Sequence, residues 1–323
     1  MQARLEVRGL TVELPTLAGW IRPVNDVSFS LAAGESLGIV GESGSGKTML
    51  SLALMGLTPP GARISGEAWL DAASARTNLV GASPAELRSM RGRRIAMIFQ
   101  EPMTALNPVL RIGAQIEEAI RVHQPRISRA ELRTRVIDSL VRAAVPDPPL
   151  RARQYPHQLS GGLRQRVMIA MALAASPGVL IADEPTTALD VTVQKQILDL
   201  LARLRHELHL SLLFITHDLG VVAQVADRVA VMYAGRIVEQ GPFAEILRRP
   251  RHPYTKGLLR AAPRLDSAEK VVPIPGIVPP LTNLPPGCSF APRCLHCVPE
   301  CQAAMPSLRN AAPDHLARCI LVP

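Results

Sequence analysis

The sequence predicts an α/β fold with a mostly parallel sheet, and two observations carry this prediction. Apolar segments typical of buried strands alternate with helix-like segments along residues 179–233, as in βα units whose helices cover a parallel sheet. A glycine-rich segment, residues 41–48, lies between an apolar strand and a helix, the setting that phosphate-binding loops require. We therefore expect a domain that binds a phosphate ligand.

The first predicted elements are strands. Residues 4–14 alternate between apolar and polar side chains, and residues 27–31 form a second short strand, so we expect an antiparallel layer here. Residues 36–40 are a continuous apolar run that enters the glycine-rich loop, and residues 47–57 follow as a helix. Residues 95–99 predict another buried strand.

The pattern becomes helical between residues 112 and 173. Ser128 and Glu131 have the spacing of a capping box that opens one helix, and Pro146, Pro148 and Pro149 close it. Strands are then expected at residues 179–182, 212–216 and 228–233, with helices at 192–208 and 219–226. Residues 273–286 contain six prolines, which favour an extended path.

Composition fits a folded globular protein. The 323 residues suffice for one large domain and a smaller one, and 47% of them are hydrophobic. The net charge of +9 suits nucleic acid, an anionic membrane surface or a phosphate ligand, but an aromatic content of 3% argues against a base-stacking surface. The excess charge is concentrated near the C-terminus, where residues 248–323 hold ten Lys and Arg against four Asp and Glu.

Neither a membrane span nor a signal peptide is expected. The membrane-like stretch of residues 167–182 is too short and is interrupted by Ser176, Pro177 and Gly178. The first ten residues lack an apolar core and include Glu6. These features predict a protein that stays in the cytoplasm.

The glycine-rich loop matches G-x-x-x-x-G-K-[ST] at every fixed position. Its glycines allow the backbone to wrap a phosphate chain, and its N–H groups point at the anion. Lys47 supplies a charge to the β- and γ-phosphates, and the Thr48 hydroxyl joins the Mg²⁺ shell. The predicted ATP-binding residues of the loop are Gly41, Glu42, Ser43, Gly44, Ser45, Gly46, Lys47 and Thr48.

Two further strand ends carry candidate catalytic residues. Asp183 and Glu184 follow a buried strand at its carboxyl end, where open α/β sheets bind ligands. We expect Asp183 to hold Mg²⁺ and Glu184 to act as the general base toward water. His217 follows the next strand, where its imidazole can hydrogen-bond the γ-phosphate.

Motifs between these segments resemble those of the ATP-binding cassette (ABC) ATPases. The segment LSGGLRQR at residues 159–166 is similar to the family signature, in which Ser160, Gly161 and Gly162 contact the γ-phosphate of ATP held by a second subunit. By the same resemblance Gln100 is the Q-loop residue, which touches Mg²⁺ and the attacking water and links to the transmembrane partner. Asp190 matches the D-loop and His217 the switch histidine.

The resemblance is narrower still to the ATPase subunits of oligopeptide/dipeptide importers. It rests on FQEPMTALNP, DEPTTALDVTVQ, RHPYTKGLL and PGCSFAPRC, and covers almost the whole chain. It implies a P-loop NTPase with a RecA-like core, an antiparallel β-subdomain, an α-helical subdomain at about residues 101–175, and a cysteine-containing extension. The cassette would span residues 1–250 and the extension 251–323.

The resemblance also implies a cellular role. The chain would be a translocase ATPase, peripheral at the cytoplasmic face of the membrane. Its partners would be a second ABC ATPase subunit, two permeases and an extracytoplasmic substrate-binding protein, with no nucleic acid. Peptides are the expected cargo, although nickel and glutathione importers use similar motors.

The sequence departs from the family at two places. Leu163 stands where the signature often has Gln or Met, which should matter little because the phosphate contacts fall on Ser160 and the glycines. The family stacks an aromatic side chain on adenine near the end of the first strand, and residues 12–15 offer none. Trp20 or Leu14 is the candidate substitute.

All five cysteines lie in the last 36 residues, and clustered thiolates in a cytoplasmic protein suggest a metal site. Some members of the resembled family hold a [4Fe–4S] cluster in this tail, and the matching ligands would be Cys288, Cys294, Cys301 and Cys319. Cys297 would then be spare. A zinc site using Cys294 and Cys297, or unliganded thiols, are the alternatives.

Two other functions remain open. A non-transport cassette acting on ribosomes or nucleic acid would suit the positive charge, but such proteins usually join two cassettes or carry long coiled-coil inserts. A regulatory subunit that binds ATP without hydrolysing it is disfavoured by the complete set of Lys47, Asp183, Glu184 and His217.

Overall fold

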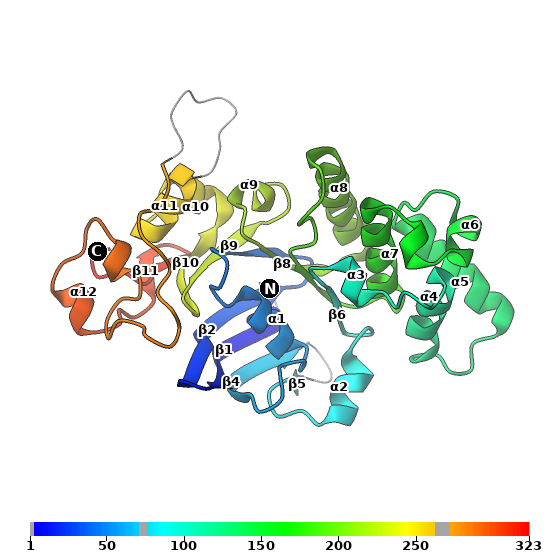
Figure 1. Ribbon diagram of the computed structural model, residues 1–323, viewed down its shortest axis with the longest axis horizontal. Coiled ribbons are helices and arrows are strands. Elements are labelled where there is room, and N and C mark those ends of the chain that lie inside the picture. Colours follow the sequence, from blue (N-terminus) through cyan, green and yellow to red (C-terminus); the bar gives the residue numbers. More distant parts are fainter. Residues whose placement is uncertain (1–2, 71–75, 262–271, 323) are drawn as a thin grey trace. The chain divides into compact units, whose positions relative to one another are not determined.

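The computed structural model describes residues 3–70, 76–261 and 272–322. The chain divides into two compact units. The first comprises residues 1–4, 31–35 and 81–213, and the second comprises residues 5–30, 36–80 and 214–323. Figure 1 shows the helices and strands of both units along the chain. No helix within the described ranges is both long enough and apolar enough to cross a membrane.

The first unit is mainly helical. Its strands β6 and β7 pair in parallel, with Ile98 opposite Ala182, so that their carboxyl ends lie at the same edge. All residues of both strands are buried. The unit contains α2 (Pro84–Met90), β6 (Ile95–Ile98), α3 (Pro102–Ala105), α4 (Ile112–Arg121), α5 (Arg129–Arg142), α6 (Pro148–Arg153), η1 (Pro156–Gln158), α7 (Gly161–Leu173), β7 (Val179–Asp183) and α8 (Val191–Leu208).

Helix starts in this unit follow the expected chemistry in one case and not in another. The Ser128 hydroxyl accepts from the Glu131 N–H and caps α5, as its spacing predicts. The prolines at 146, 148 and 149, which were expected to end that helix, lie beyond its end. α5 ends at Arg142, and Pro148 occupies the first turn of α6, where a missing N–H costs nothing.

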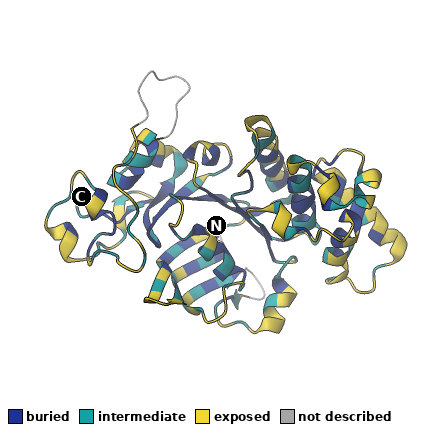
Figure 2. Cartoon of the chain, in the orientation of Figure 1, coloured by how far each residue is buried: buried dark blue, intermediate teal, exposed yellow. Residues whose placement is uncertain are grey.

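The second unit contains an antiparallel sheet, as predicted, in the order β2-β1-β4-β5. These strands are β1 (Ala3–Thr16), β2 (Gly19–Ala32), β4 (Arg63–Leu70) and β5 (Thr77–Asn78), and the ends of β1 and β2 extend into residues of the first unit. The alternation of the sequence appears as burial: Leu5 and Val7 are at most 1% exposed, whereas Glu6 and Arg8 point to the other face. Figure 2 shows the alternating burial along these strands.

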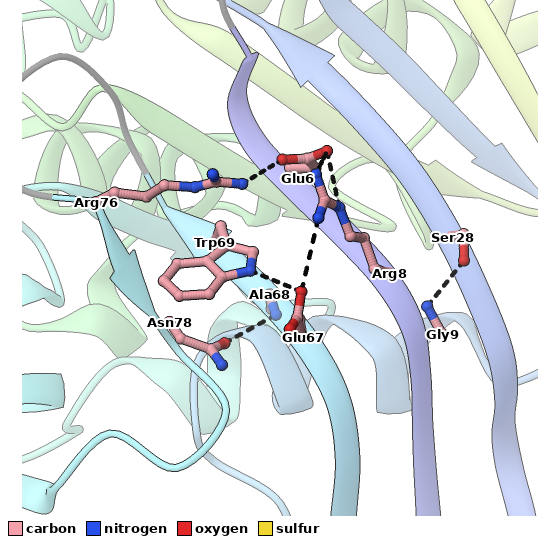
Figure 3. A network of polar contacts seen from close by, with 9 residues as sticks. All are labelled: Glu6, Arg8, Gly9, Ser28, Glu67, Ala68, Trp69, Arg76 and Asn78. Atoms are coloured by element: carbon pink, nitrogen blue, oxygen red, sulfur yellow. Dashed lines mark hydrogen bonds and ion pairs between the residues drawn. The ribbon is translucent and has the colours of Figure 1, made fainter.

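The outward face of this sheet carries a network of polar contacts (Figure 3). The register places Arg8 opposite Glu67 and Glu6 opposite Trp69. Arg8 donates to Glu6 at 2.6 Å, and the Trp69 indole donates to Glu67 at 2.9 Å. Exposed ion pairs of this kind contribute little to stability, so the network serves mainly to keep this face polar.

The remainder of the second unit contains sheet strands in the order β11-β12-β10-β9-β3. β3 and β9 are parallel, whereas β10, β11 and β12 extend the sheet in antiparallel fashion. Strand β8 (Ser211–Thr216) is divided between the units after Leu213. The other elements are β3 (Ser36–Val40), α1 (Lys47–Leu54), α9 (Leu219–Val222), β9 (Arg228–Tyr233), β10 (Arg236–Pro242), α10 (Phe243–Arg248), α11 (Pro253–Ala261), η2 (Ala291–Arg293), α12 (Glu300–Ala303), β11 (Arg309–Ala312) and β12 (His315–Ala317).

The expected elements are largely present, with shifts at their ends. The predicted helix at residues 47–57 ends at Leu54, and that at 219–226 is only Leu219–Val222. The proline-rich residues 273–286 form no helix or strand, in line with the expected extended path. β4, β5, β10, β11 and β12 were not predicted.

Candidate functional site

The phosphate loop connects β3, whose five residues are all buried, to α1, which begins at Lys47. Two of its glycines are required by their surroundings. A Cβ at Gly41 would lie 2.1 Å from the Met232 carbonyl oxygen, and one at Gly46, where φ is 102°, would lie 1.8 Å from that of Pro23. Only glycine allows the loop to pass this close to neighbouring backbone.

Lys47 is 4% exposed, and its ammonium group turns back onto the loop. Nζ donates to the Gly41 carbonyl at 2.7 Å and to the Glu42 carbonyl at 3.0 Å, with the Ser45 hydroxyl at 3.4 Å. These contacts hold a positive charge in the centre of the loop, where a phosphate chain can accept from it. Ser43, Gly44 and Thr48 are exposed, so the outer side of the loop is open to a ligand.

In the first unit, Gln100 and Glu184 meet at the carboxyl ends of β6 and β7. The Gln100 amide donates to Oε2 of Glu184 at 3.2 Å. The Thr187 hydroxyl donates to the same oxygen at 2.8 Å. Glu184 has a φ of 46°, an unusual left-handed conformation for a non-glycine residue and one that is enriched at active sites. Asp183, the last residue of β7, is 1% exposed.

Sequence reasoning missed Thr187. It lies three residues after Glu184 in the segment DEPTTALD, of which the second half yielded only Asp190 as a candidate. The one sequence signal for Thr187 was its position inside this motif. The two donors on one oxygen fix the orientation of the Glu184 carboxylate.

The signature residues begin a helix, as expected. Ser160 is the N-cap of α7, and its hydroxyl accepts from the Leu163 N–H at 3.4 Å. Acting as an acceptor there leaves the hydroxyl its own proton to donate. Ser160 and Gly161 are exposed at this helix start, which favours an anion.

The start of α8 lies against the start of α7. Asp190 caps α8 by accepting from the Val193 N–H at 2.9 Å. A Cβ added to Gly162 would be 2.7 Å from a methyl group of Val193. The structure therefore brings the signature glycines and Asp190 onto one surface of the first unit, where Gly161 and Asp190 are exposed and Gly162 is half-buried.

His217 directly follows β8 and is exposed in the second unit, which also holds the phosphate loop. Of the two candidates for stacking on adenine, Leu14 is half-buried on β1, whereas Trp20 is 45% exposed on β2. The Arg63 guanidinium lies 3.9 Å from the centroid of the Trp20 ring, a cation–π contact that occupies one face of the indole. The role of Trp20 stays a prediction.

The cysteines are all free thiols, with Cys301 and Cys319 buried. The Cys288 N–H donates to the Cys301 carbonyl at 2.7 Å. The pKa of the Cys288 thiol is raised to about 11, mainly by burial, with smaller contributions from the neighbouring Cys301 and Cys319. Burial also raises the pKa of Cys294, with contributions from Cys301, Cys319 and Cys297. The tail thus gathers its thiols into one neighbourhood.

These thiols do not form a ready metal site. Within the part of the chain that the structure describes, no group of three or more His, Cys, Asp and Glu side chains is placed to hold a metal ion. The expected iron–sulfur cluster and its zinc alternative are therefore not supported by this arrangement.

Comparison with known proteins adds two matches to families. Residues 24–187 match the ABC transporter family, and residues 238–301 match the C-terminal region of oligopeptide/dipeptide transporters. A putative peptide import ATP-binding protein of Brucella ovis is 51% identical over 99% of this chain and 97% of its own. The dipeptide transport ATP-binding protein DppD of Bacillus subtilis is 47% identical over 99% and 95%.

Solved structures give the same answer for the fold. A dimeric ATP-binding cassette in a post-hydrolysis state, bound to ADP and Pi, is 28% identical, with a TM-score of 0.66 over 74% of this chain and 98% of the other. The protein cbiO1 of Clostridium perfringens, part of an ABC transporter complex, is 27% identical, with a TM-score of 0.62 over 77% and 92%.

Proposed function

The chain belongs to the ABC transporter family, as an ATPase with the C-terminal region of oligopeptide/dipeptide transporters, and we propose that it is the motor subunit of a peptide importer. The expected P-loop NTPase fold with an antiparallel β-sheet is confirmed by the cassette structures. The observation that carries the catalytic part of the proposal is the Glu184 carboxylate, held by Gln100 and Thr187 at a strand end. The peptide cargo is inferred from the names of the full-length relatives.

We propose that Glu184 is the general base. Two hydrogen-bond donors on Oε2 orient the carboxylate, so that it accepts a proton from water without first reorganising. The water then attacks the γ-phosphorus of ATP, and the bond to the β–γ bridging oxygen breaks to give ADP and phosphate. His217 donates to the γ-phosphate in this scheme, while Lys47 and the loop N–H groups bind the phosphate chain.

The residues proposed for Mg²⁺ are Thr48, Gln100 and Asp183. Each of these side chains has an oxygen atom that can bind a metal, and oxygen is the ligand that this hard cation prefers. Thr48 is exposed on the loop. When bound, Mg²⁺ neutralises charge that develops on the phosphates.

Ser160, Gly161 and Gly162 are proposed to act on ATP held by another subunit, with Asp190 at the same interface. Ser160 and Gly161 are exposed at the start of α7, and Gly162 is half-buried beside them, which leaves this helix start available to such a partner. The similar solved cassette that is bound to ADP and Pi is itself dimeric, which supports this arrangement. We propose a second ABC ATPase and two permeases as partners, with an extracytoplasmic protein delivering the peptide.

This arrangement predicts that the isolated chain binds ATP but hydrolyses it slowly, because the signature residues that complete each ATP site are proposed to come from another subunit. The assembly co-purified from membranes should turn over ATP at least about 100-fold faster per chain, in line with the loss of one set of charge-stabilising donors. Steady-state phosphate release from both preparations checks this. Equal rates at chain concentrations where it is monomeric would contradict the shared site, and co-purification with ribosomes instead of polytopic proteins would contradict the transport role.

Residues 1–250 are proposed as the cassette, with a helical part at 101–175, and residues 251–323 as the extension. The chain is proposed to sit peripherally at the cytoplasmic face of the membrane, because its partners there are permeases.

We also propose that the extension holds a [4Fe–4S] cluster on Cys288, Cys294, Cys301 and Cys319. Support comes from the family resemblance and from the gathering of these cysteines in one part of the tail, where the Cys288 N–H donates to the Cys301 carbonyl at 2.7 Å. The cluster would take no part in ATP hydrolysis.

Anaerobically purified protein is expected to show broad visible absorption that bleaches on reduction, with iron and sulfide in equal amounts. Cys301→Ser should abolish this absorption, because it removes a ligand. Cys297→Ser, the matched control in the same segment, should retain it. A colourless sample that contains stoichiometric zinc would refute the iron–sulfur proposal.

A further inference from the structure

An ion pair joins the C-terminal extension to the phosphate loop across 251 residues of sequence. Arg293 donates to both carboxylate oxygens of Glu42, the second residue of the loop, at 2.7 and 3.1 Å. The Arg293 side chain is only 4% exposed, and that of Glu42 is 30% exposed. A bidentate pair of this kind is stronger and more directional than a surface pair, because solvent screens it less.

The extension holds the guanidinium in place from several sides. Arg293 ends the short helix η2, and its Nε donates to the Pro275 carbonyl at 3.0 Å. The guanidinium also lies 5.9 Å from the ring centroids of Tyr233 and Phe290. Its position is therefore fixed by the fold and does not depend on Glu42 alone.

Glu42 is held through its backbone as well as its carboxylate. Its N–H donates to the hydroxyl of Tyr254 on α11 at 2.9 Å, and Tyr254 is fully buried. Burial raises the pKa of Tyr254, so this hydroxyl stays protonated at neutral pH. The Glu42 carbonyl accepts from Lys47 at 3.0 Å. Glu42 thus connects Lys47 to Tyr254 and Arg293, two side chains from the part of the chain after residue 250.

The charges at this point make the pair relevant to ATP. Without Arg293, the Glu42 carboxylate would stand uncompensated in the loop that receives a polyanionic phosphate chain. The same loss would remove one of the two restraints that the extension places on Glu42, whose carbonyl accepts from Lys47, and leave only the backbone bond to Tyr254. Both effects oppose nucleotide binding.

We propose that Arg293 is a positioning residue for the ATPase reaction: acting through Glu42, it fixes the phosphate loop, so that the C-terminal extension sets the affinity for ATP. This inference rests on the proposed binding of ATP at the loop.

The test is Mg-ATP binding to the full-length chain by calorimetry, with ATPase kinetics in the co-purified assembly. Arg293→Gln is expected to weaken binding about tenfold, within the range of couplings between contacting charged groups. In the assembly it should raise KM for ATP by a similar factor and change kcat less than about twofold, because the residue does not touch the reacting atoms. Arg293→Lys should recover part of the affinity.

A matched control is Arg318→Gln. Arg318 is a second buried arginine of the extension that pairs with a carboxylate, Asp26 at 3.3 Å. Its other hydrogen bonds among the described residues go to the carbonyls of Ile237 and Pro306, which lie outside the phosphate loop. It should lower the unfolding temperature comparably while leaving ATP affinity within about twofold of the parent. Equal losses of affinity in Arg293→Gln and Arg318→Gln would reduce Arg293 to a general stabiliser and overturn the inference.

A double-mutant cycle with Glu42→Gln tests whether Arg293 affects ATP affinity through its ion pair with Glu42. The double variant should bind ATP no more weakly than Arg293→Gln alone, because both substitutions remove the same interaction. Losses that multiply would show that the two residues act separately, against the inference. Failure of the parent chain itself to bind Mg-ATP would instead refute the proposed function, so the two failures are distinguishable.

Discussion

Glu184→Gln is expected to leave Mg-ATP binding within about threefold of the parent and to lower kcat by about 100- to 10,000-fold, the range for loss of a general base. The amide has almost the same shape and retains an oxygen that accepts from Gln100 and Thr187, so the local hydrogen bonds survive. It cannot accept the proton of the attacking water. The substitution therefore separates binding from chemistry.

The measurement is phosphate release by the co-purified assembly, with nucleotide affinity determined on the same preparation. The partner ATPase should be catalytically inactive, so that its own site contributes no turnover. Glu207→Gln is the matched control, since Glu207 is an exposed carboxylate paired with Arg203 on α8 and should leave kcat unchanged. Undiminished turnover in Glu184→Gln would exclude its role as general base.

Contiguous motifs account for the part of the site that the sequence predicts. The phosphate loop, Glu184 and the cap at Ser160 each depend on residues a few positions apart, and their chemistry is visible in the local pattern. A mostly parallel sheet was predicted from the alternation of strands and helices, and the parallel pairing of β6 with β7 agrees with it, although that particular pairing was not predicted.

The contacts that escaped sequence reasoning are those set by the tertiary fold. Nothing local indicates that Arg293 pairs with Glu42, or that Tyr254 accepts from the Glu42 N–H. β10 was missed for another reason. Its RIVEQGP sequence buries Glu239 and Gln240, and the Glu239 carboxylate is paired with His315 at 2.7 Å, so polar residues interrupt the apolar pattern of a buried strand.

The boundaries of helices depended on turn chemistry that propensity does not resolve. Pro148 was read as a stop signal for the preceding helix, although proline is equally at home in a first helical turn. Asp147 precedes it with a φ of 48°, a conformation that separates the two helices. The same proline thus starts α6, and the stop signal lies earlier in the chain.

Lys47→Ala is expected to weaken Mg-ATP binding to the full-length chain by at least about 100-fold. A charge-assisted hydrogen bond contributes about 1.5–3 kcal/mol, and the ammonium group is proposed to meet more than one phosphate oxygen. Lys47 is also 4% exposed and donates to the Gly41 and Glu42 carbonyls. Its removal therefore takes away both the positive charge of the loop and the two hydrogen bonds that hold that charge in place.

Calorimetric titration of the variant with Mg-ATP checks this, alongside its thermal unfolding without nucleotide. Lys195→Ala provides the control, because Lys195 is 69% exposed in an i,i+4 pair with Asp199 on α8 and should keep the parent affinity. If Lys47→Ala lost affinity only in proportion to a lower unfolding temperature, loop collapse would explain the result. Lys47→Arg separates these cases: it keeps a charge that can stabilise the loop but is too bulky for the buried position, so it should restore folding and not ATP affinity.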